Sequence, residues 1–349
     1  MKMTELLQAA VDSRASDVLL AAGAPPMFRI RGELEPTEQE LLTPAVLEEL
    51  CKQVLSDVQV QTLERDKDVD FAVAVPSLGR FRFNVHYQRG SYAAAIRYIP
   101  SQVPELKKLG LPPAVEELTK LHHGLVLVTG QTGSGKTTTL ASLMEHINQR
   151  DAKHLITLED PIEFQYTHGR SLVEQREVGS DCPSFASGLK HVLRQDPDVI
   201  LVGELRDLET IRTALQAAET GHLVFSTLHS SSAAGSIDRI IEVFPAGEQA
   251  QIRMHLAECL RGVVTQRLLH SEDGRGRAVA AEVLISNRPV QTSIREATTH
   301  LIPGLISTGR RNGMQTLEQA LKELVLNGRV LPETAEAHLQ ELSKMSVNG

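Results

Sequence analysis

One short segment constrains the fold of this chain more than any other feature. Residues 130–137 read GQTGSGKT, and they come just after the apolar run Leu125–Val128. Glycines in such a loop let backbone N–H groups turn inward around phosphate oxygens, above the positive end of a following helix. Residues 138–149 have the composition of that helix. A strand, a glycine-rich loop and a helix in this order predict a phosphate-binding loop, because a turn with an exposed lysine explains neither flank.

The side chains of this loop suit a nucleotide and a magnesium ion. Lys136 can reach the β- and γ-phosphates, and the Thr137 hydroxyl can ligate Mg²⁺. The residues predicted to bind the nucleotide are Gly130, Thr132, Gly133, Ser134, Gly135, Lys136, Thr137 and Thr138.

Composition limits the other possibilities. At 349 residues and 41% hydrophobic side chains, the chain suits about two domains. Its net charge of −8 does not favour a broad nucleic-acid-binding surface. Cys51, Cys182 and Cys259 are far apart, so we expect buried cysteines in a reducing compartment and no disulfide framework or four-cysteine zinc site. No stretch approaches the roughly 18 apolar residues of a membrane span, so we expect a soluble protein that reaches a membrane through a partner.

The pattern along the chain predicts two domains joined by a linker. Residues 1–100 indicate an α+β domain, since a helical stripe precedes strand-like segments. Residues 81–88 alternate apolar and polar side chains, which is the period of a half-buried antiparallel strand. Proline and glycine punctuate residues 101–116, which we interpret as the linker. The second domain spans 117–349 and is mostly helical from about residue 286.

Apolar runs in the second domain alternate with helical patterns, which is typical of a largely parallel sheet covered on both faces. The runs predicted to be strands are 125–129, 154–158, 199–202 and 223–227. Ile252, Leu256, Cys259, Leu260 and Val263 keep a helical spacing, so we predict that a helix continues through them. The predicted fold class is therefore α/β, with a P-loop domain after an α+β domain.

Acidic residues follow two of these strands. Glu204 comes after the run 199–202, where it would lie beside Mg²⁺ and hold a metal-bound water. A glutamate in solvent at a strand end is the alternative.

A second acidic group follows the strand 154–158. Glu159, Asp160 and Glu163 lie around Pro161, which ends the strand at the sheet edge where α/β proteins bind ligands. One of these acids could orient or deprotonate an attacking water. Spacing alone does not choose among them, and an acidic turn in solvent is the alternative.

Two histidines, His222 and His229, bracket the strand 223–227. A histidine at the γ-phosphate side could sense the nucleotide, and an ordinary hydrogen-bonding role is equally consistent with the sequence.

Taken together, these segments resemble the secretion ATPases and, within them, the PilT-like family of type IV pilus retraction motors. The matching segments are 156–164, 175–179, 194–207 and 220–241, with shorter matches at 15–17, 23–26, 79–82 and 313–317. The resemblance implies a PAS-like first domain and a RecA-like ATPase domain, with ATP bound in a homohexameric ring.

The resemblance also implies roles for particular residues. Glu163 matches the catalytic glutamate, Glu204 the acid of the magnesium-side strand, and His222 and His229 the histidine box. Arg82 and Arg97 are the best matches to arginines that the first domain supplies to the site, where they would stabilise charge on the transferring phosphoryl group. An exposed strand face is the alternative explanation for both arginines.

The implied activity is ATP hydrolysis that powers pilus retraction at the cytoplasmic face of the inner membrane. The implied partners are a membrane platform protein and other pilus ATPases. One departure matters: the family's C-terminal AIRNLIRE segment is represented here by VQTSIRE at 290–296. An accessory retraction ATPase and a nucleotide-dependent regulatory ring are therefore alternatives, and a DNA-translocating motor is the least favoured.

Overall fold

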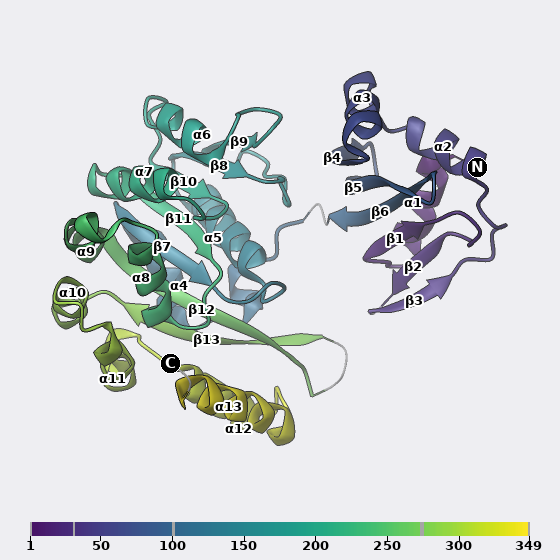
Figure 1. Cartoon of the computed structure of the whole chain (residues 1–349). Helices are drawn as coiled ribbons and strands as arrows, with labels where there is room; N and C mark the ends of the chain where they lie inside the picture. Colours follow the sequence, from purple (N-terminus) through teal and green to yellow (C-terminus); the bar gives the residue numbers. More distant parts are fainter. Residues whose placement is uncertain (1, 31, 100–101, 273–275, 348–349) are drawn as a thin grey trace. The chain divides into compact units, whose positions relative to one another are not determined.

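The computed structural model describes residues 2–30, 32–99, 102–272 and 276–347 (Figure 1). The chain forms two compact units. One comprises Met1–Gln102 together with Glu163–Gln165, and the other comprises Val103–Ile162 together with Tyr166–Gly349. Within the described residues, no helix has both the length and the apolar character needed to span a bilayer.

The first unit is an α+β fold built on an antiparallel six-stranded sheet with strand order β3-β2-β1-β6-β5-β4. Its elements are α1 (Met3–Asp12), β1 (Asp17–Leu20), β2 (Met27–Ile30), β3 (Glu33–Pro36), α2 (Pro44–Lys52), α3 (Asp57–Asp66), β4 (Asp68–Val75), β5 (Gly79–Gln88) and β6 (Ser91–Ile99). The alternation predicted for β5 is present, since Phe81, Phe83 and Val85 are all 0% exposed on the core face.

The second unit is an α/β fold, as predicted, with strand order β13-β12-β7-β11-β10-β8-β9. Every neighbouring pair is parallel except β12 and β13, which form an antiparallel pair at one edge. The strands are β7 (Gly124–Thr129), β8 (His154–Glu159), β9 (Leu172–Glu177), β10 (Val199–Val202), β11 (Leu223–Leu228), β12 (Leu260–His270) and β13 (Arg277–Ile285).

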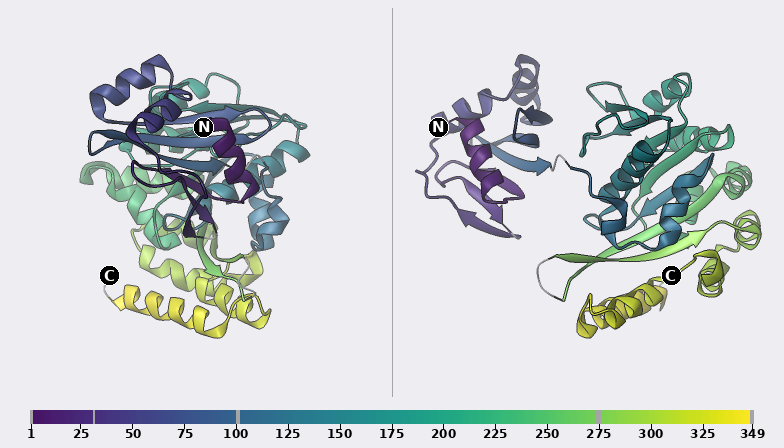
Figure 2. Two further views of the ribbon diagram at one scale, coloured as in Figure 1. Left: turned by 90° about the vertical axis from the view of Figure 1, so that its right-hand side faces the viewer. Right: turned by 180° about the vertical axis from the view of Figure 1, so that it is seen from behind.

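Helices cover both faces of this sheet (Figures 1 and 2). The elements are η1 (Leu106–Leu109), α4 (Pro113–Glu117), η2 (Leu118–Lys120), α5 (Lys136–Arg150), α6 (Phe185–Val192), α7 (Leu208–Glu219), α8 (Ala233–Glu242), α9 (Ala246–Cys259), α10 (Arg288–Arg295), η3 (Thr299–Leu301), α11 (Ile302–Thr308), η4 (Arg310–Asn312), α12 (Leu317–Leu326) and α13 (Pro332–Val347). Successive residues of β7 point to opposite cores: Leu125 and Leu127 pack with α6–α11, whereas Val126 and Val128 pack with α4 and α5. A strand buried on both faces needs apolar residues throughout, which explains the continuous apolar run.

Two sequence-based expectations differ from the structure. Helix α9 ends at Cys259, and Leu260 and Val263 lie in β12, where they pair with Leu125 and Leu127 of β7. The helical spacing was misleading because a strand buried on both faces has no distinctive period. The change of structure also occurs without a glycine or proline, since Leu260 simply adopts extended backbone angles.

The second difference concerns the predicted linker. Residues 103–116 contain η1 and most of α4, and Leu106 and Val115 are buried in the core of the second unit. The Ser142 hydroxyl of α5 donates to the Pro104 carbonyl at 2.7 Å. This stretch therefore packs as part of the second unit, while residues 100 and 101 lie outside the described residues.

The three cysteines are buried, as expected. Burial raises the pKa of the Cys51 and Cys259 thiols to about 12 and also raises the pKa of Cys182. They serve as small apolar side chains in their cores.

Candidate functional site

The phosphate loop joins the end of β7 to the first turn of α5. Gly130, Gly133 and Gly135 have φ angles of +144°, +79° and +88°, which other residues adopt only under strain. A Cβ atom on Gly130 would lie 2.4 Å from Ser134 Oγ and 2.5 Å from the Gln266 carbonyl oxygen of β12. The loop can therefore follow this path only with glycine at its first position.

Two polar side chains of the loop are buried. Lys136 is 9% exposed, and its ammonium donates to the Gly130 and Gln131 carbonyl oxygens, both at 3.0 Å. Ser134 is 6% exposed, and its hydroxyl has no hydrogen-bond partner within the described residues. A bound phosphate would give this buried hydroxyl the partner it lacks. The remaining predicted loop residues are accessible, with Thr132 and Gly133 exposed and Thr137 and Thr138 partly buried.

Glu204 lies beyond the end of β10, at the same edge of the sheet. The Thr227 hydroxyl of β11 donates to the Gly203 carbonyl at 2.6 Å, which fixes the backbone just before the acid. Glu204 Oε2 is 2.6 Å from Arg206 Nε and 3.9 Å from His229 Nε2. The structure therefore brings Glu204 and His229 together.

His229 follows β11, and its imidazole is affected by the surrounding charges. Burial lowers its pKa, and the positive charge of Lys136 lowers it further, whereas Glu204 raises it. Arg206 and Arg239 add smaller lowering effects. At neutral pH the neutral imidazole is favoured, so His229 can both accept and donate a hydrogen bond.

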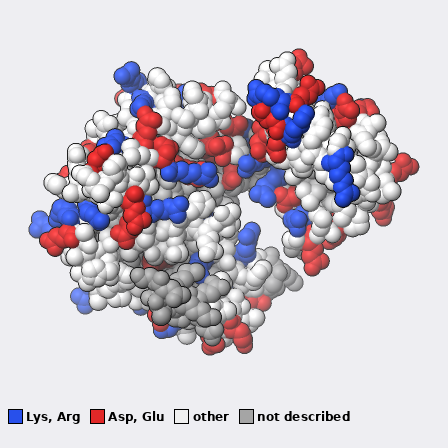
Figure 3. Space-filling model, viewed as in Figure 1, with Lys and Arg blue, Asp and Glu red and all other residues white. Residues whose placement is uncertain are grey.

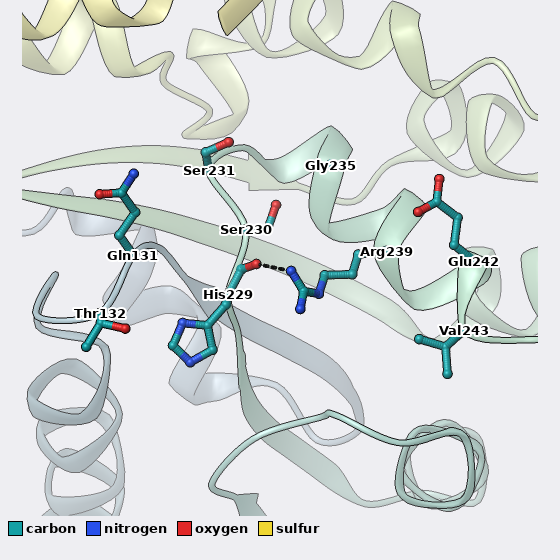
Figure 4. A pocket seen from close by; sticks show the side chains of 9 residues that line it. All are labelled: Gln131, Thr132, His229, Ser230, Ser231, Gly235, Arg239, Glu242 and Val243. Atoms are coloured by element: carbon teal, nitrogen blue, oxygen red, sulfur yellow. Dashed lines mark hydrogen bonds between the residues drawn. The ribbon is translucent and has the colours of Figure 1, made fainter. Parts of the chain in front are cut away.

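His229 borders a pocket of about 850 Å³ (Figure 4). Arg239 of α8 reaches across it, and its Nη1 donates to the His229 carbonyl at 2.7 Å. The lining residues are Gln131, Thr132, His229, Ser230, Ser231, Gly235, Arg239, Glu242 and Val243.

Arg239 is the main pocket residue to which the sequence assigned no role. It lies in the segment 220–241 that carried the family resemblance, but nothing in its neighbours marked it as a pocket residue. Its spacing of ten residues from His229 spans a loop and two turns of α8, so only the folded chain brings them together.

His222 does not lie at this site. It precedes β11, whereas His229 follows it, and a six-residue strand separates them by about 20 Å at roughly 3.3 Å per residue. Its ring nitrogen Nδ1 lies 3.0 Å from the Ala217 carbonyl of α7, and its own carbonyl accepts from the Gly124 amide. His222 is therefore not among the residues that line the pocket within one chain, and its predicted role in nucleotide binding as part of the histidine box stays a prediction.

The structure separates two members of the acidic group after β8. Glu159 is 8% exposed, and its Oε1 accepts from the Thr157 hydroxyl at 2.7 Å and from Gln175 Nε2 at 3.2 Å. The Glu159 carboxylate therefore links β8 to β9 through its hydrogen bond from Gln175. Glu163 is only partly buried and groups with the first unit, and its catalytic role stays a prediction.

Arg82 and Arg97 lie opposite each other on β5 and β6. Their side chains are 40% and 67% exposed. Directly opposed like charges destabilise a sheet, and here two acids offset them: Asp17 Oδ1 is 2.8 Å from Arg97 Nε, and Asp70 Oδ1 is 3.9 Å from Arg82 Nη2. Both arginines are available on the polar face of the first unit.

The donors at the phosphate loop fit Mg²⁺ bound together with phosphates. The Thr137 hydroxyl and the Glu204 carboxylate are both hard oxygen donors, and Mg²⁺ binds few protein ligands when phosphates and waters supply the others. Among the described residues, no three histidine, cysteine, aspartate or glutamate side chains form a metal-binding group. An all-protein metal cage is thus not what these residues form.

Comparison with known proteins places this geometry in a family. The family described as "Type II/IV secretion system protein" matches residues 2–345. A type IV pilus retraction ATPase from Pseudomonas aeruginosa, PilT, is 44% identical over 96% of this chain and 97% of its own. A twitching motility protein from Neisseria gonorrhoeae is 43% identical over 92% of this chain and 86% of its own.

A solved structure gives the same fold. The crystal structure of the pilus retraction motor PilT with bound ADP is 47% identical, with a TM-score of 0.90, and covers 96% of each chain. The match extends over both units, so the α/β class and the RecA-like ATPase fold are confirmed.

Proposed function

Because the chain belongs to the type II/IV secretion system protein family, we propose that it is an ATP-hydrolysing motor that powers the retraction of type IV pili. The observation that carries this proposal is the likeness to PilT over nearly the whole length of both chains. The phosphate loop, Glu204 and His229 supply the chemistry that such a motor needs.

ATP binding draws on groups already at the sheet edge. Hydrogen bonds to the Gly130 and Gln131 carbonyls keep the Lys136 ammonium at the phosphate loop, where it would donate to β- and γ-phosphate oxygens. Thr137 would hold Mg²⁺ through its hydroxyl, and Glu204 would hold it through a water. Mg²⁺ held there would supply positive charge that offsets the negative charge developing on the phosphates. His229 lies beside Glu204, where its imidazole can contact the γ-phosphate.

Hydrolysis also needs a group that prepares the water. We assign this role to Glu163, because the buried carboxylate of Glu159 is occupied by Thr157 and Gln175. A carboxylate at that point orients the water and takes its proton.

We propose that the working assembly is a homohexamer. In this ring, Arg82 or Arg97 completes a nucleotide site and stabilises the charge of the transferring phosphoryl group. The exposed guanidinium groups on the polar face of the first unit are consistent with this role.

We place the ring in the cytoplasm, at the inner-membrane base of the pilus, where it acts on a platform protein. Other pilus ATPases are further candidate partners. Acidic and basic side chains are interspersed over the visible face of the second unit, which does not resemble a nucleic-acid surface (Figure 3).

A second candidate function rests on the departure at residues 290–296. This segment overlaps α10, and its last residues, Ile294, Arg295 and Glu296, match the family segment, whereas residues 290–293 differ from it. An accessory retraction ATPase, or a regulatory ring with little mechanical output, would tolerate such changes.

Deletion of the gene tests the proposal. A retraction motor predicts excess surface pili and loss of twitching motility, because pilins are still added but not removed. An accessory ATPase predicts normal pili with weakened movement under load. A regulatory ring predicts altered pilus number with very slow steady-state ATP turnover by the purified protein. Unchanged pili and motility would contradict all three.

A further inference from the structure

Three polar residues lie side by side in the second sheet, between the phosphate loop and helix α8. Thr129 of β7 is in register with Thr265 of β12, and Thr265 is in register with Glu282 of β13. Residues in register project from the same face of a sheet. Thr129 and Thr265 are 0% and 1% exposed, and their hydroxyl oxygens are 2.9 Å apart. We call Thr129, Thr265 and Glu282 the polar row.

One end of the polar row meets the phosphate loop. Thr129 is the last residue of β7, and Gly130 begins the loop. Strand β12 also contacts the loop directly, since the Gln266 carbonyl leaves no space for a side chain at Gly130. The row and the loop are therefore parts of one packed region.

The other end of the polar row meets the first turn of α8. Glu282 Oε1 accepts from the Ala233 amide at 2.7 Å. The first amides of a helix have no partner within the helix, and here Ser232 caps the Gly235 amide while Glu282 caps the Ala233 amide. Burial raises the pKa of Glu282, and the bond from Ala233 lowers it. A carboxylate in this place interacts favourably with the positive end of the helix.

Helix α8 in turn forms one wall of the pocket. Gly235, Arg239 and Glu242 line it, and Arg239 holds the His229 carbonyl. The short loop from His229 to Ser232 leads directly into the turn that Glu282 caps. His229 is thus joined to α8 both by this loop and by the hydrogen bond from Arg239.

We infer that Glu282 is a positioning residue for ATP hydrolysis: by holding the Ala233 amide, it fixes His229 and Arg239 relative to the phosphate loop. Glu282 acts through α8 and does not touch the nucleotide. The inference rests on the proposed function for its effect on turnover. A buried carboxylate is also a poor way to gain stability, since an apolar residue of similar size often stabilises as much or more.

The test compares substitutions of Glu282 that change the length of the side chain and its charge independently. Glu282→Gln keeps an acceptor oxygen at the same reach and removes the charge. Glu282→Asp keeps the charge but is one methylene shorter, and Glu282→Leu removes the acceptor. The control is Glu318→Gln on α12, whose side chain is 58% exposed and pairs with Lys322.

The first measurement is hydrogen–deuterium exchange of residues 229–242 without nucleotide. We expect faster exchange in Glu282→Leu and Glu282→Asp, and exchange like the wild type in Glu282→Gln and the control. The second is steady-state ATP turnover with the melting temperature recorded in parallel. In Glu282→Leu we expect kcat to fall about tenfold or more, which is the range for residues that orient catalytic groups without contacting the substrate. KM should change much less, and the melting temperature should stay near that of the wild type.

Two results would overturn the inference. One is wild-type exchange and kcat in Glu282→Leu. The other is an equal loss in Glu282→Gln and Glu282→Asp, which would show that charge or general packing matters instead of reach. The Gln and Asp variants decide the question even if Glu282→Leu does not fold. Wild-type protein and Lys136→Ala are measured alongside: absence of turnover in the wild type contradicts the proposed function, while the exchange experiment still decides the role of Glu282.

Discussion

The two sheets of this molecule present polar side chains in different ways. The sheet of the first unit is antiparallel, with one apolar core face and a polar face that carries Arg82 and Arg97. The sheet of the second unit has helices on both faces, and all six residues of β7 and of β11 are buried. Its polar candidates therefore lie where the strands end.

This difference explains where chemistry can occur in each unit. A half-exposed sheet can offer charges from the middle of its strands, but they remain in solvent, where their interactions are weak. Parallel strands bring their carboxyl ends to one edge, and there Lys136, Glu204 and His229 influence one another. We therefore expect substitutions at the carboxyl ends of these strands to remove ATP turnover. Substitutions on the polar face of the first unit should lower turnover only if a bound nucleotide or another subunit contacts that face.

The largest effect is expected at the phosphate loop. Lys136→Ala removes the cation that faces the β- and γ-phosphates, so ATP turnover should fall to background, a loss of roughly 10⁶-fold or more for a typical enzyme. Lys120→Ala is the control, because Lys120 lies before β7 and its side chain is 53% exposed. Steady-state ATPase assays on folded protein check both, and full activity in Lys136→Ala would contradict the site.

The second-largest loss of turnover is expected for substitutions on the polar face of the first unit. Replacing the correct arginine, Arg82 or Arg97, by alanine should lower turnover by about 10³–10⁵-fold, as expected for an arginine that contacts the transferring phosphoryl group. ATP affinity should change much less. Mixing this variant with Glu163→Gln tests whether the site is shared between subunits. Restored activity indicates a composite site across a subunit boundary, whereas no rescue places both groups in one chain. A fully active monomer at low concentration would contradict the ring.

The acidic group after β8 gives a smaller effect. Glu163→Gln should keep nucleotide binding and lower turnover by about 10²–10⁴-fold, because the amide cannot take the proton of water. Glu159→Gln should retain hydrolysis, since Glu159 serves Thr157 and Gln175. ATP affinity and kcat are measured for both. The reverse pattern would mean that Glu159 is the catalytic acid.

The histidines at the two ends of β11 test whether turnover depends on the end of the sheet where the phosphate loop lies. His229→Gln should lower kcat by about 10–100-fold, the range for groups that orient a reacting site. His222→Gln should leave the turnover of each site nearly unchanged, because its contacts are with the main chain of α7. Comparable losses of kcat in the two variants would mean that His222 reaches a nucleotide site in a neighbouring subunit.

The smallest effect is a pH dependence of stability. His229 has a lower pKa in the folded chain than the ordinary value of 6.5, so the unfolded chain binds more protons between these two values. This contribution to stability is present above about pH 6.5 and is lost as the pH falls through the folded value. The effect should be small, since the side chain is 40% exposed. Urea unfolding of the wild type and of His229→Gln between pH 5 and 8 measures this contribution. If the free energy of unfolding changed with pH in the same way in both proteins, the prediction would be wrong.

Several features were predictable because one local pattern determined them. The alternation at residues 81–88 defined the core face of β5, and the apolar run with its glycine loop defined β7, the phosphate loop and α5. The placement of His222 was also within reach of the sequence. Residues that bracket a strand must lie at its opposite ends, whatever their resemblance to a motif.

Other features depended on contacts that no local pattern contains. β12 followed α9 without a turn residue, so its identity came from pairing with β7. Glu282 sits among apolar residues of β13, and its function emerges only when α8, far away in the sequence, places the Ala233 amide against it. Arg239 likewise acquires its role from a hydrogen bond across the pocket.

The burial of all three cysteines has a practical consequence for measuring conformational change with labels attached to cysteine. Burial raises the pKa of all three thiols and so suppresses the thiolate, which is the form that reacts with maleimides. A single cysteine introduced on an exposed surface, such as position 254 on α9, would then carry a fluorophore or spin label without removal of the native residues. Distances between labels in successive nucleotide states could thus be measured in an otherwise unaltered chain.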